Sequence, residues 1–130
     1  MSVVEHAAIE PVSLPGIEHR TVAGPRDGLK SLEVWVQTLA PGAETPLHRH
    51  DCEEVVVVLA GAGRCEINGE VQVFGPGSTI IVPPNAVHRL VVTSEEEMRV
   101  VAAVGMAPVT VETPDGARLP LPWDQHHLAR

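Results

Sequence analysis

Aromatic side chains are almost absent from this chain of 130 residues: Trp35, Phe74 and Trp123 are the only Phe, Trp or Tyr residues. We therefore expect any pocket to be lined mainly by Val, Ile, Leu and polar groups, and do not expect a site that stacks a flat ligand between rings. Basic residues are also few, with 9 Lys and Arg against 17 Asp and Glu and a formal net charge of -8. Nucleic acids and anionic membranes attract a basic surface, so we expect neither as a partner.

Other absences limit where the protein works. The two cysteines, Cys52 and Cys65, lack the CxxC spacing and are expected to be free thiols in a reducing compartment. No apolar run approaches the roughly 18 residues that a membrane helix needs. Residues 1–11 have neither the basic start nor the long apolar stretch of a secretory signal. We therefore expect one cytoplasmic domain with a single core.

Proline and glycine, by contrast, are frequent, with 12 and 11 residues. They cut the chain into short pieces rich in Val and Ile, and no stretch shows the sustained apolar period of a helix. Asn68 and Gly69 form the dipeptide that favours a type I′ hairpin turn. The expected strands cover residues 19–23, 32–39, 45–50, 54–60, 64–67, 71–74, 78–82, 87–93 and 99–105. This pattern predicts an all-β sandwich or barrel.

Two of these expected strands contain continuous apolar runs. Residues 55–58 read VVVV and residues 100–104 read VVAAV. A strand that is apolar on both faces is normally covered on both faces, inside a two-sheet barrel or at a subunit contact. The tail at residues 108–130 is rich in proline and is expected to be irregular.

A group of good metal ligands precedes the most apolar strand. In an extended segment His48 and His50 point to the same side, whereas Arg49 points away. A straight strand from His48 to Glu54 would span about 20 Å, ten times a metal–ligand bond, so the chain must turn back at residues 51–53. His88 follows a double proline and is the candidate fourth ligand. A lone histidine in this setting would be interpreted as a core or rim residue. Because His48 and His50 already form two ligands of an incomplete site, the metal-ligand interpretation is preferred for His88.

These residues resemble the first of the two motifs of the cupin family. That motif is Gly, five residues, His-x-His, three or four residues, Glu, six residues and Gly. The chain supplies it with Gly42, His48, His50, Glu54 and Gly61.

The second cupin motif is Gly, five residues, Pro-x-Gly, two residues, His, three residues and Asn. Gly77, Pro83 and His88 match it, whereas Asn85 replaces the second Gly and Val92 replaces the Asn. Asn tolerates left-handed backbone angles, so the first departure is mild. The resemblance implies a double-stranded β-helix, the jelly-roll or cupin barrel, at residues 31–107. A segment with an edge strand would precede it at residues 1–30, and the tail at residues 108–130 would pack on the barrel or on a partner.

Carried over by position, the metal ligands would be His48, His50, Glu54 and His88. Glu53 is the rival of Glu54, but only Glu54 fits the family's spacing. The resemblance implies one divalent transition-metal ion per chain (Fe, Mn, Ni, Co, Cu or Zn), which this ligand set cannot distinguish. It also implies a homodimer, because small cupins commonly pair through their sheets.

The resemblance leaves the reaction open, because cupins include dioxygenases, isomerases, lyases, cyclases and binding proteins. We expect a metal-dependent enzyme acting on a small oxygen-bearing metabolite, with a dioxygenase ahead of the other reactions. The alternative is a non-enzymatic cupin that binds a small molecule. Gln37 is the candidate catalytic group: if the odd-numbered face of residues 33–38 lines the barrel, Gln37 would handle protons or orient the substrate, and Trp35 would wall the pocket. Parity alone does not choose that face.

Further candidates have less functional interpretations. Cys52 could be a ligand, but a small residue at a corner is the preferred interpretation. Arg49 and Arg89 each adjoin a proposed ligand and are expected to face outward. His126 and His127 are adjacent and would point in opposite directions in an extended tail, which makes them a poor chelate.

Overall fold

The computed structural model describes residues 3–123. Within that range no helix is long and apolar enough to cross a membrane. Two one-turn 3-10 helices, His6–Ala8 and Pro25–Asp27, are the described helical elements. All other regular structure is β-sheet, as the sequence predicts, and the strands pair in antiparallel fashion.

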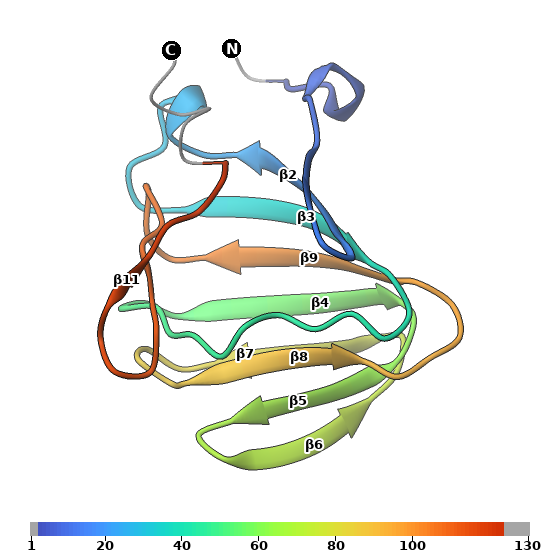
Figure 1. The fold of residues 1–130 in the computed structure, drawn as a ribbon. Helices are drawn as coiled ribbons and strands as arrows, with labels where there is room; N and C mark the ends of the chain where they lie inside the picture. Colours follow the sequence, from blue (N-terminus) through green and yellow to red (C-terminus); the bar gives the residue numbers. More distant parts are fainter. Residues whose placement is uncertain (1–2, 124–130) are drawn as a thin grey trace.

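The larger sheet has six strands, with β3 (Glu33–Leu39) and β9 (Met98–Val104) at its centre (Figure 1). In spatial order they are β1 (Val12–Leu14), β2 (Ile17–Ala23), β3 (Glu33–Leu39), β9 (Met98–Val104), β4 (Glu54–Ala60) and β7 (Ser78–Val82). Alternate residues of each strand face the inside of the barrel. β9 buries every second side chain from Met98 to Val104, and β3 buries Glu33, Trp35 and Leu39.

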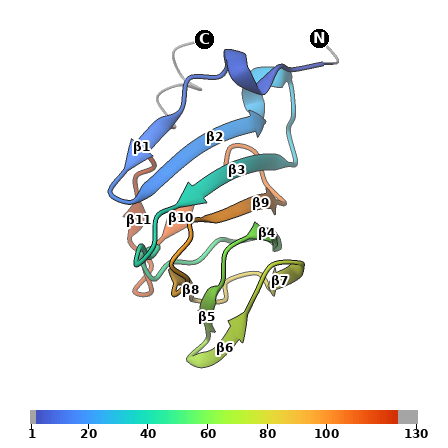
Figure 2. The same ribbon diagram turned by 90° about the vertical axis from the view of Figure 1, so that its right-hand side faces the viewer.

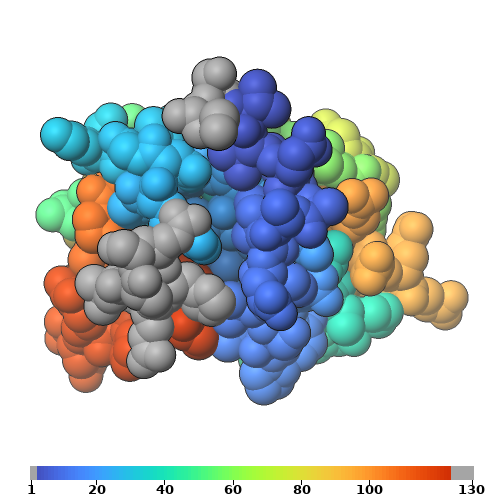
Figure 3. All heavy atoms as spheres, turned by 90° about the horizontal axis from the view of Figure 1, so that it is seen from above, coloured from blue at the N-terminus to red at the C-terminus, as the bar shows by residue number. Residues whose placement is uncertain are grey.

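Two smaller sheets complete the barrel (Figure 2). One contains β6 (Glu70–Phe74), β5 (Gly63–Ile67) and β8 (His88–Val92), and the other pairs β10 (Val111–Glu112) with β11 (Arg118–Leu119). The C-terminal segment with β11 lies across one end of the sheets (Figure 1). Seen from above, the N-terminal residues and β2, in blue, occupy much of one face, and the C-terminal segment, in red, occupies a corner (Figure 3).

The turns follow from their residues. Asn68 and Gly69 both have positive φ, 49° and 82°, as the predicted type I′ turn between β5 and β6 requires. Gly61 has φ 82°, and a Cβ added there would lie 2.6 Å from the Cα of Met98. Only glycine therefore lets the end of β4 pass so close to β9.

One predicted strand is wrong. Residues 45–50 form no continuous strand but make isolated bridges, His48 with His88 and Arg49 with Glu112, after an earlier bridge at Glu44. Pro46 has no N–H to donate, and the segment changes partner from β8 to β10 between His48 and Arg49, so no continuous ladder forms along it. The other predicted strands are present with small shifts at their ends.

The barrel covers one face of the apolar run at residues 55–58, and cover of its other face by a subunit contact stays a prediction. Val56 and Val58 are buried, but Val57 and Leu59 on the other face of β4 are 36% and 55% exposed. Ile81 on the neighbouring strand β7 is 63% exposed. Packing inside the barrel therefore accounts for the apolar residues on the inner face of β4 and β7. The apolar residues on the outer face of these two strands remain exposed.

The tail is more regular than the sequence suggests, since it contains β10 and β11. Leu121 and Trp123 of the tail pack onto the barrel core, the first of the two arrangements expected for the tail. At the other end of the chain, β2 pairs along β3, so the N-terminal segment belongs to the large sheet. His126 and His127 lie outside the described residues.

Candidate metal centre

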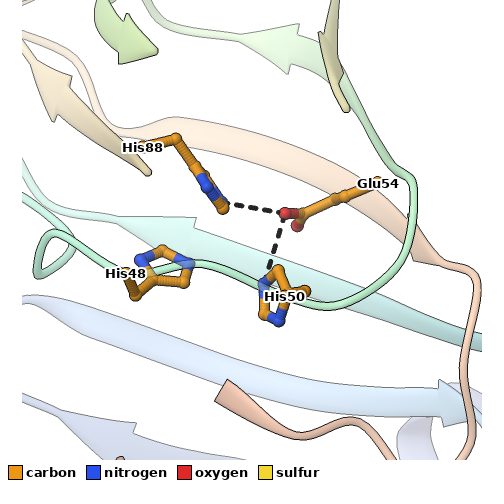
Figure 4. A group of neighbouring side chains, drawn as sticks. All are labelled: His48, His50, Glu54 and His88. Carbon is orange, nitrogen blue, oxygen red and sulfur yellow. Dashed lines mark hydrogen bonds and ion pairs between the residues drawn. The ribbon is translucent and has the colours of Figure 1, made fainter. Parts of the chain in front are cut away.

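The four predicted ligands come together inside the barrel. His48, His50, Glu54 and His88 each place one ligand atom within 4.8 Å of the others (Figure 4). His48 and His50 lie on the bridged segment, while Glu54 and His88 are the first residues of β4 and β8. Glu53, the rival carboxylate, is exposed and outside the group.

Short loops bring these elements together. The chain bends at residues 51–52, as the distance argument requires, and the N–H of Gly105 donates to the carbonyl of Glu53 at 2.9 Å. From the other side, the N–H of Asn85 donates to the carbonyl of His50 at 2.7 Å. Asn85 has φ 63°, so it takes the left-handed conformation that the motif's usual glycine would supply. The loop between β7 and β8 thus holds the backbone of His50 beside His88.

All three histidines use Nδ1 to contact a backbone carbonyl. The acceptors are Pro46 for His48 at 2.6 Å, Thr110 for His50 at 3.1 Å and Ala86 for His88 at 2.9 Å. A hydrogen on Nδ1 leaves Nε2 of a neutral imidazole with a lone pair, which is the atom and tautomer that a metal ion takes.

The contacts to Glu54 fit a cation at the centre. Its Oε1 lies 3.0 Å from Nε2 of His88 and 3.4 Å from Nε2 of His50. The longer contact is an ion-pair distance without hydrogen-bond geometry, and the buried Nε2 of His50 has no hydrogen-bond partner among the described residues. A lone pair on nitrogen and a carboxylate oxygen repel each other unless a proton or a metal ion lies between them. The donor set could therefore hold a metal ion.

The electrostatics of the cluster favour deprotonated ligands at two positions. Burial, and then the neighbouring charge of His88, lower the pKa of His48 to about 4. Burial alone would raise the pKa of Glu54, but contacts with His50 and His88 lower it to about 2. For His50, burial acts to lower the pKa, but the carboxylate of Glu54 and the carbonyl of Thr110 raise it overall. Metal binding at His50 therefore competes with a proton more than it would at an unperturbed histidine.

A cavity of about 540 Å³ adjoins the cluster. Its other walls are mainly aliphatic side chains and prolines, from the barrel and from both ends of the chain, among them Leu14, Val100, Leu119 and Pro122. Trp35 and Trp123 also line it, with ring centres 5.3 Å apart and planes at 72°. The expected aliphatic lining is present. The two tryptophans of the chain also contribute to the lining, and their rings lie edge to face rather than parallel.

The odd-numbered face of β3 points inward, which settles the parity that the sequence left open. Trp35 and Gln37 both line the cavity. The amide of Gln37 donates to Nδ1 of His19 at 2.9 Å, and Nε2 of His19 pairs with Thr21 at 2.8 Å. A catalytic role of Gln37 stays a prediction.

The remaining candidates behave as surface or structural residues. Arg49 pairs with Glu112 at 3.0 Å, and Arg89 pairs with Glu66 at 2.8 Å, both away from the cluster. Cys52 is a free thiol at the bend, and burial raises its pKa, so it is not an activated thiolate.

Sequence reasoning missed His19 as part of the pocket's support. Its ring is fully buried and stacks on Trp123, with centres 3.6 Å apart. It also missed Thr45 and Pro46 as lining residues. The one available signal was their position just before the His-x-His pair.

The barrel and the His-His-Glu-His cluster define a small cupin-superfamily domain. A cupin described as RmlC-like from Shewanella frigidimarina is similar in fold, with a TM-score of 0.73 and 18% identity over 83% of this chain and 93% of that one. The model of the auxin-binding protein family matches residues 4–125, so the chain belongs to that family.

Two relatives in that family are plant proteins. The chain is 37% identical to auxin-binding protein 1 of Arabidopsis thaliana, over 85% of this chain and 66% of the relative. It is 40% identical to auxin-binding protein T85 of Nicotiana tabacum, over 88% of this chain and 64% of the relative. The chain thus spans a little under two thirds of these relatives' length.

Proposed function

We propose that this protein is a metal-dependent binding protein for a small apolar carboxylic acid, with an auxin as the model ligand. The observation that carries the proposal is the direct contact between the four-ligand cluster and an apolar cavity. Four protein ligands leave up to two positions on an octahedral ion, and a carboxylate can occupy them. The apolar body of the ligand would then lie against Trp35, Trp123 and the aliphatic wall.

The size and chemistry of the cavity support this proposal. About 540 Å³ lies within the range of small-molecule sites, roughly 300–1,000 Å³. An auxin is a small aromatic ring system with a carboxylic acid side chain, so it offers one anionic end and one apolar end. The relatives at 37% and 40% identity are named for binding auxin.

A binding role is favoured over the enzyme expected from the sequence. Among the described residues that line the cavity, Glu44 is the only titratable side chain outside the cluster, and it lies 3.9 Å from Arg89 at the surface. Gln37 can orient a ligand but cannot carry a proton at neutral pH. A metal-dependent dioxygenase remains the second candidate, since oxygen chemistry at an open metal position needs the least help from the protein.

Calorimetry with matched ligands tests the binding proposal. Zinc-loaded protein should bind indole-3-acetic acid at least tenfold more tightly than metal-free protein. The same ring with an alcohol in place of the acid should show no such dependence on metal. Equal affinity with and without zinc would contradict the proposal. Oxygen uptake by the iron-loaded protein with a carboxylate ligand would favour the dioxygenase instead.

We also propose that the protein pairs with a second copy through the outer face of β4 and β7. Val57, Leu59 and Ile81 form an exposed apolar surface on adjacent strands, and β7 is the edge of the large sheet. An apolar face of this kind is a frequent interaction surface. Light scattering should give twice the mass of the chain.

A further inference from the structure

An acidic residue lies fully buried on the inner face of the barrel without touching the proposed site. Glu33, the first residue of β3, is 0% exposed and does not line the cavity. Among the described residues no cation pairs with it, and a buried carboxylate is costly unless hydrogen bonds satisfy it. The backbone of Gly24 packs against the Glu33 side chain: a Cβ added at Gly24 would lie only 3.4 Å from Cγ of Glu33.

Two donors satisfy this carboxylate, one at each oxygen. The indole Nε1–H of Trp35 donates to Oε1 at 2.8 Å. The backbone N–H of Val109, 76 residues further along the chain, donates to Oε2 at 3.0 Å. Glu33 therefore ties β3 to the segment that joins β9 to β10.

Both hydrogen bonds of Glu33 involve segments that contact His50 of the candidate metal centre. Next to Val109, the carbonyl of Thr110 accepts the Nδ1 contact of His50, which aims Nε2 at the cluster. Trp35, the other donor to Glu33, places its ring edge-on to the ring of His50, with centres 6.3 Å apart and planes at 70°. One carboxylate thus supports a ligand's backbone acceptor and the indole beside that ligand.

We infer that Glu33 is a positioning residue for metal and ligand binding: it holds His50, through Val109 and Thr110, and the Trp35 wall in one arrangement. The inference rests on the proposed metal site, because it assigns Glu33 to the orientation of one of that site's ligands. Groups that orient metal ligands through a hydrogen bond are worth about 10–100-fold in metal affinity.

Glu33→Gln tests the inference with little change in volume. The indole and the backbone N–H donate to different oxygens of Glu33, so in the amide one of these donors would face the NH₂ group instead of an acceptor. Zinc affinity, measured by competition with a chromophoric chelator, should fall about 10–100-fold. The visible spectrum of the cobalt-substituted protein should also change, because the His50 ligand is no longer held.

Two further variants separate positioning from loss of stability. Leu39→Ala opens the core on the same strand, where Leu39 is fully buried but makes neither of the Glu33 bonds. It should lower the unfolding midpoint and leave zinc affinity unchanged. Adding Trp35→Phe to Glu33→Gln removes the indole donor that opposes the amide's NH₂ group, so the double variant should bind zinc more tightly than Glu33→Gln alone.

The outcomes distinguish this inference from the proposed function. If the wild-type protein binds no zinc, the proposed function fails. If the wild type binds zinc and Glu33→Gln binds it equally well, only the inference about Glu33 fails. A loss in Leu39→Ala equal to that in Glu33→Gln would also overturn it.

A measurement on the wild type applies if Glu33→Gln does not fold. By reciprocity, zinc binding should strengthen the two bonds to Glu33. Hydrogen exchange at the Trp35 indole and the Val109 amide should therefore slow more on zinc addition than exchange in the β5–β6 hairpin. That hairpin belongs to the three-stranded sheet, away from Glu33. Equal slowing at all these positions would overturn the inference.

Discussion

Replacing His88 with alanine removes one of the four groups that face the proposed ion. In the folded chain the His88 ring contacts Oε1 of Glu54 through Nε2 at 3.0 Å and the carbonyl of Ala86 through Nδ1 at 2.9 Å. His48, His50 and Glu54 stay on their own elements, so the variant retains three ligands. The expected result is a large loss of metal affinity without loss of the barrel.

The size of that loss follows from the ligand count. A four-ligand zinc site in a protein contributes apparent binding free energies of about 10–16 kcal/mol, or roughly 2.5–4 kcal/mol per ligand if shared equally. At about 1.4 kcal/mol per tenfold change, His88→Ala should weaken zinc binding by about 10²–10³. The metal-free variant should also be less stable by about 1–3 kcal/mol, because the buried carboxylate of Glu54 loses its hydrogen-bond contact with His88.

Chelator competition on protein shown to be folded by circular dichroism measures the affinity directly. The matched control is Arg89→Ala, one residue along, where the side chain pairs with Glu66 at the surface. That variant should keep wild-type affinity. A folded His88→Ala protein with unchanged zinc affinity would refute the ligand assignment of His88.

Three further predictions concern pH, the pocket wall and the outer face. The metal-free protein should lose roughly 3 kcal/mol of stability as pH falls from about 4.5 to about 2, because Glu54 has a lowered folded pKa. It should also lose stability as pH rises through the raised folded pKa of His50, above 6.5, and urea midpoints that do not vary with pH would contradict both. Trp123→Ala should weaken indole-3-acetic acid binding about 30-fold, for a loss of about 2 kcal/mol in calorimetry, with zinc content unchanged; undiminished ligand affinity would remove Trp123 from the binding wall. Ile81→Lys should halve the mass seen by light scattering, whereas Val73→Lys on β6 should not, and a dimer in both variants would exclude the β4–β7 face.

The strands were predictable from local chemistry, and the four-ligand cluster from the resemblance to the cupin motifs. Alternation sets which side chains share a face, and the spacing from His48 to Glu54 demands a bend that residues 51–52 make. Asn85 was expected to tolerate left-handed angles, and it has φ 63°. These features need only short-range rules and the cupin motifs.

The errors concern long-range pairing. Residues 45–50 have strand-like composition, but their partners are β8 and β10, whose register the local sequence does not encode. The inner face at Trp35 and Gln37 was left open by the sequence, because it depends on which sheet covers β3. The sequence gives no sign that Glu33 is buried, because an acidic residue at the end of a strand is usually solvated. One of its two donors, the N–H of Val109, lies 76 residues away and becomes a neighbour only in the folded chain.

X-ray absorption at the zinc edge of the loaded protein tests the central claim most directly. The account predicts one zinc per chain, with nitrogen and oxygen ligands at about 2.0–2.2 Å and outer-shell scattering from three imidazoles. Adding indole-3-acetic acid should add an oxygen to that shell. A shell with sulfur at about 2.3 Å, or with fewer than three imidazoles, would contradict it.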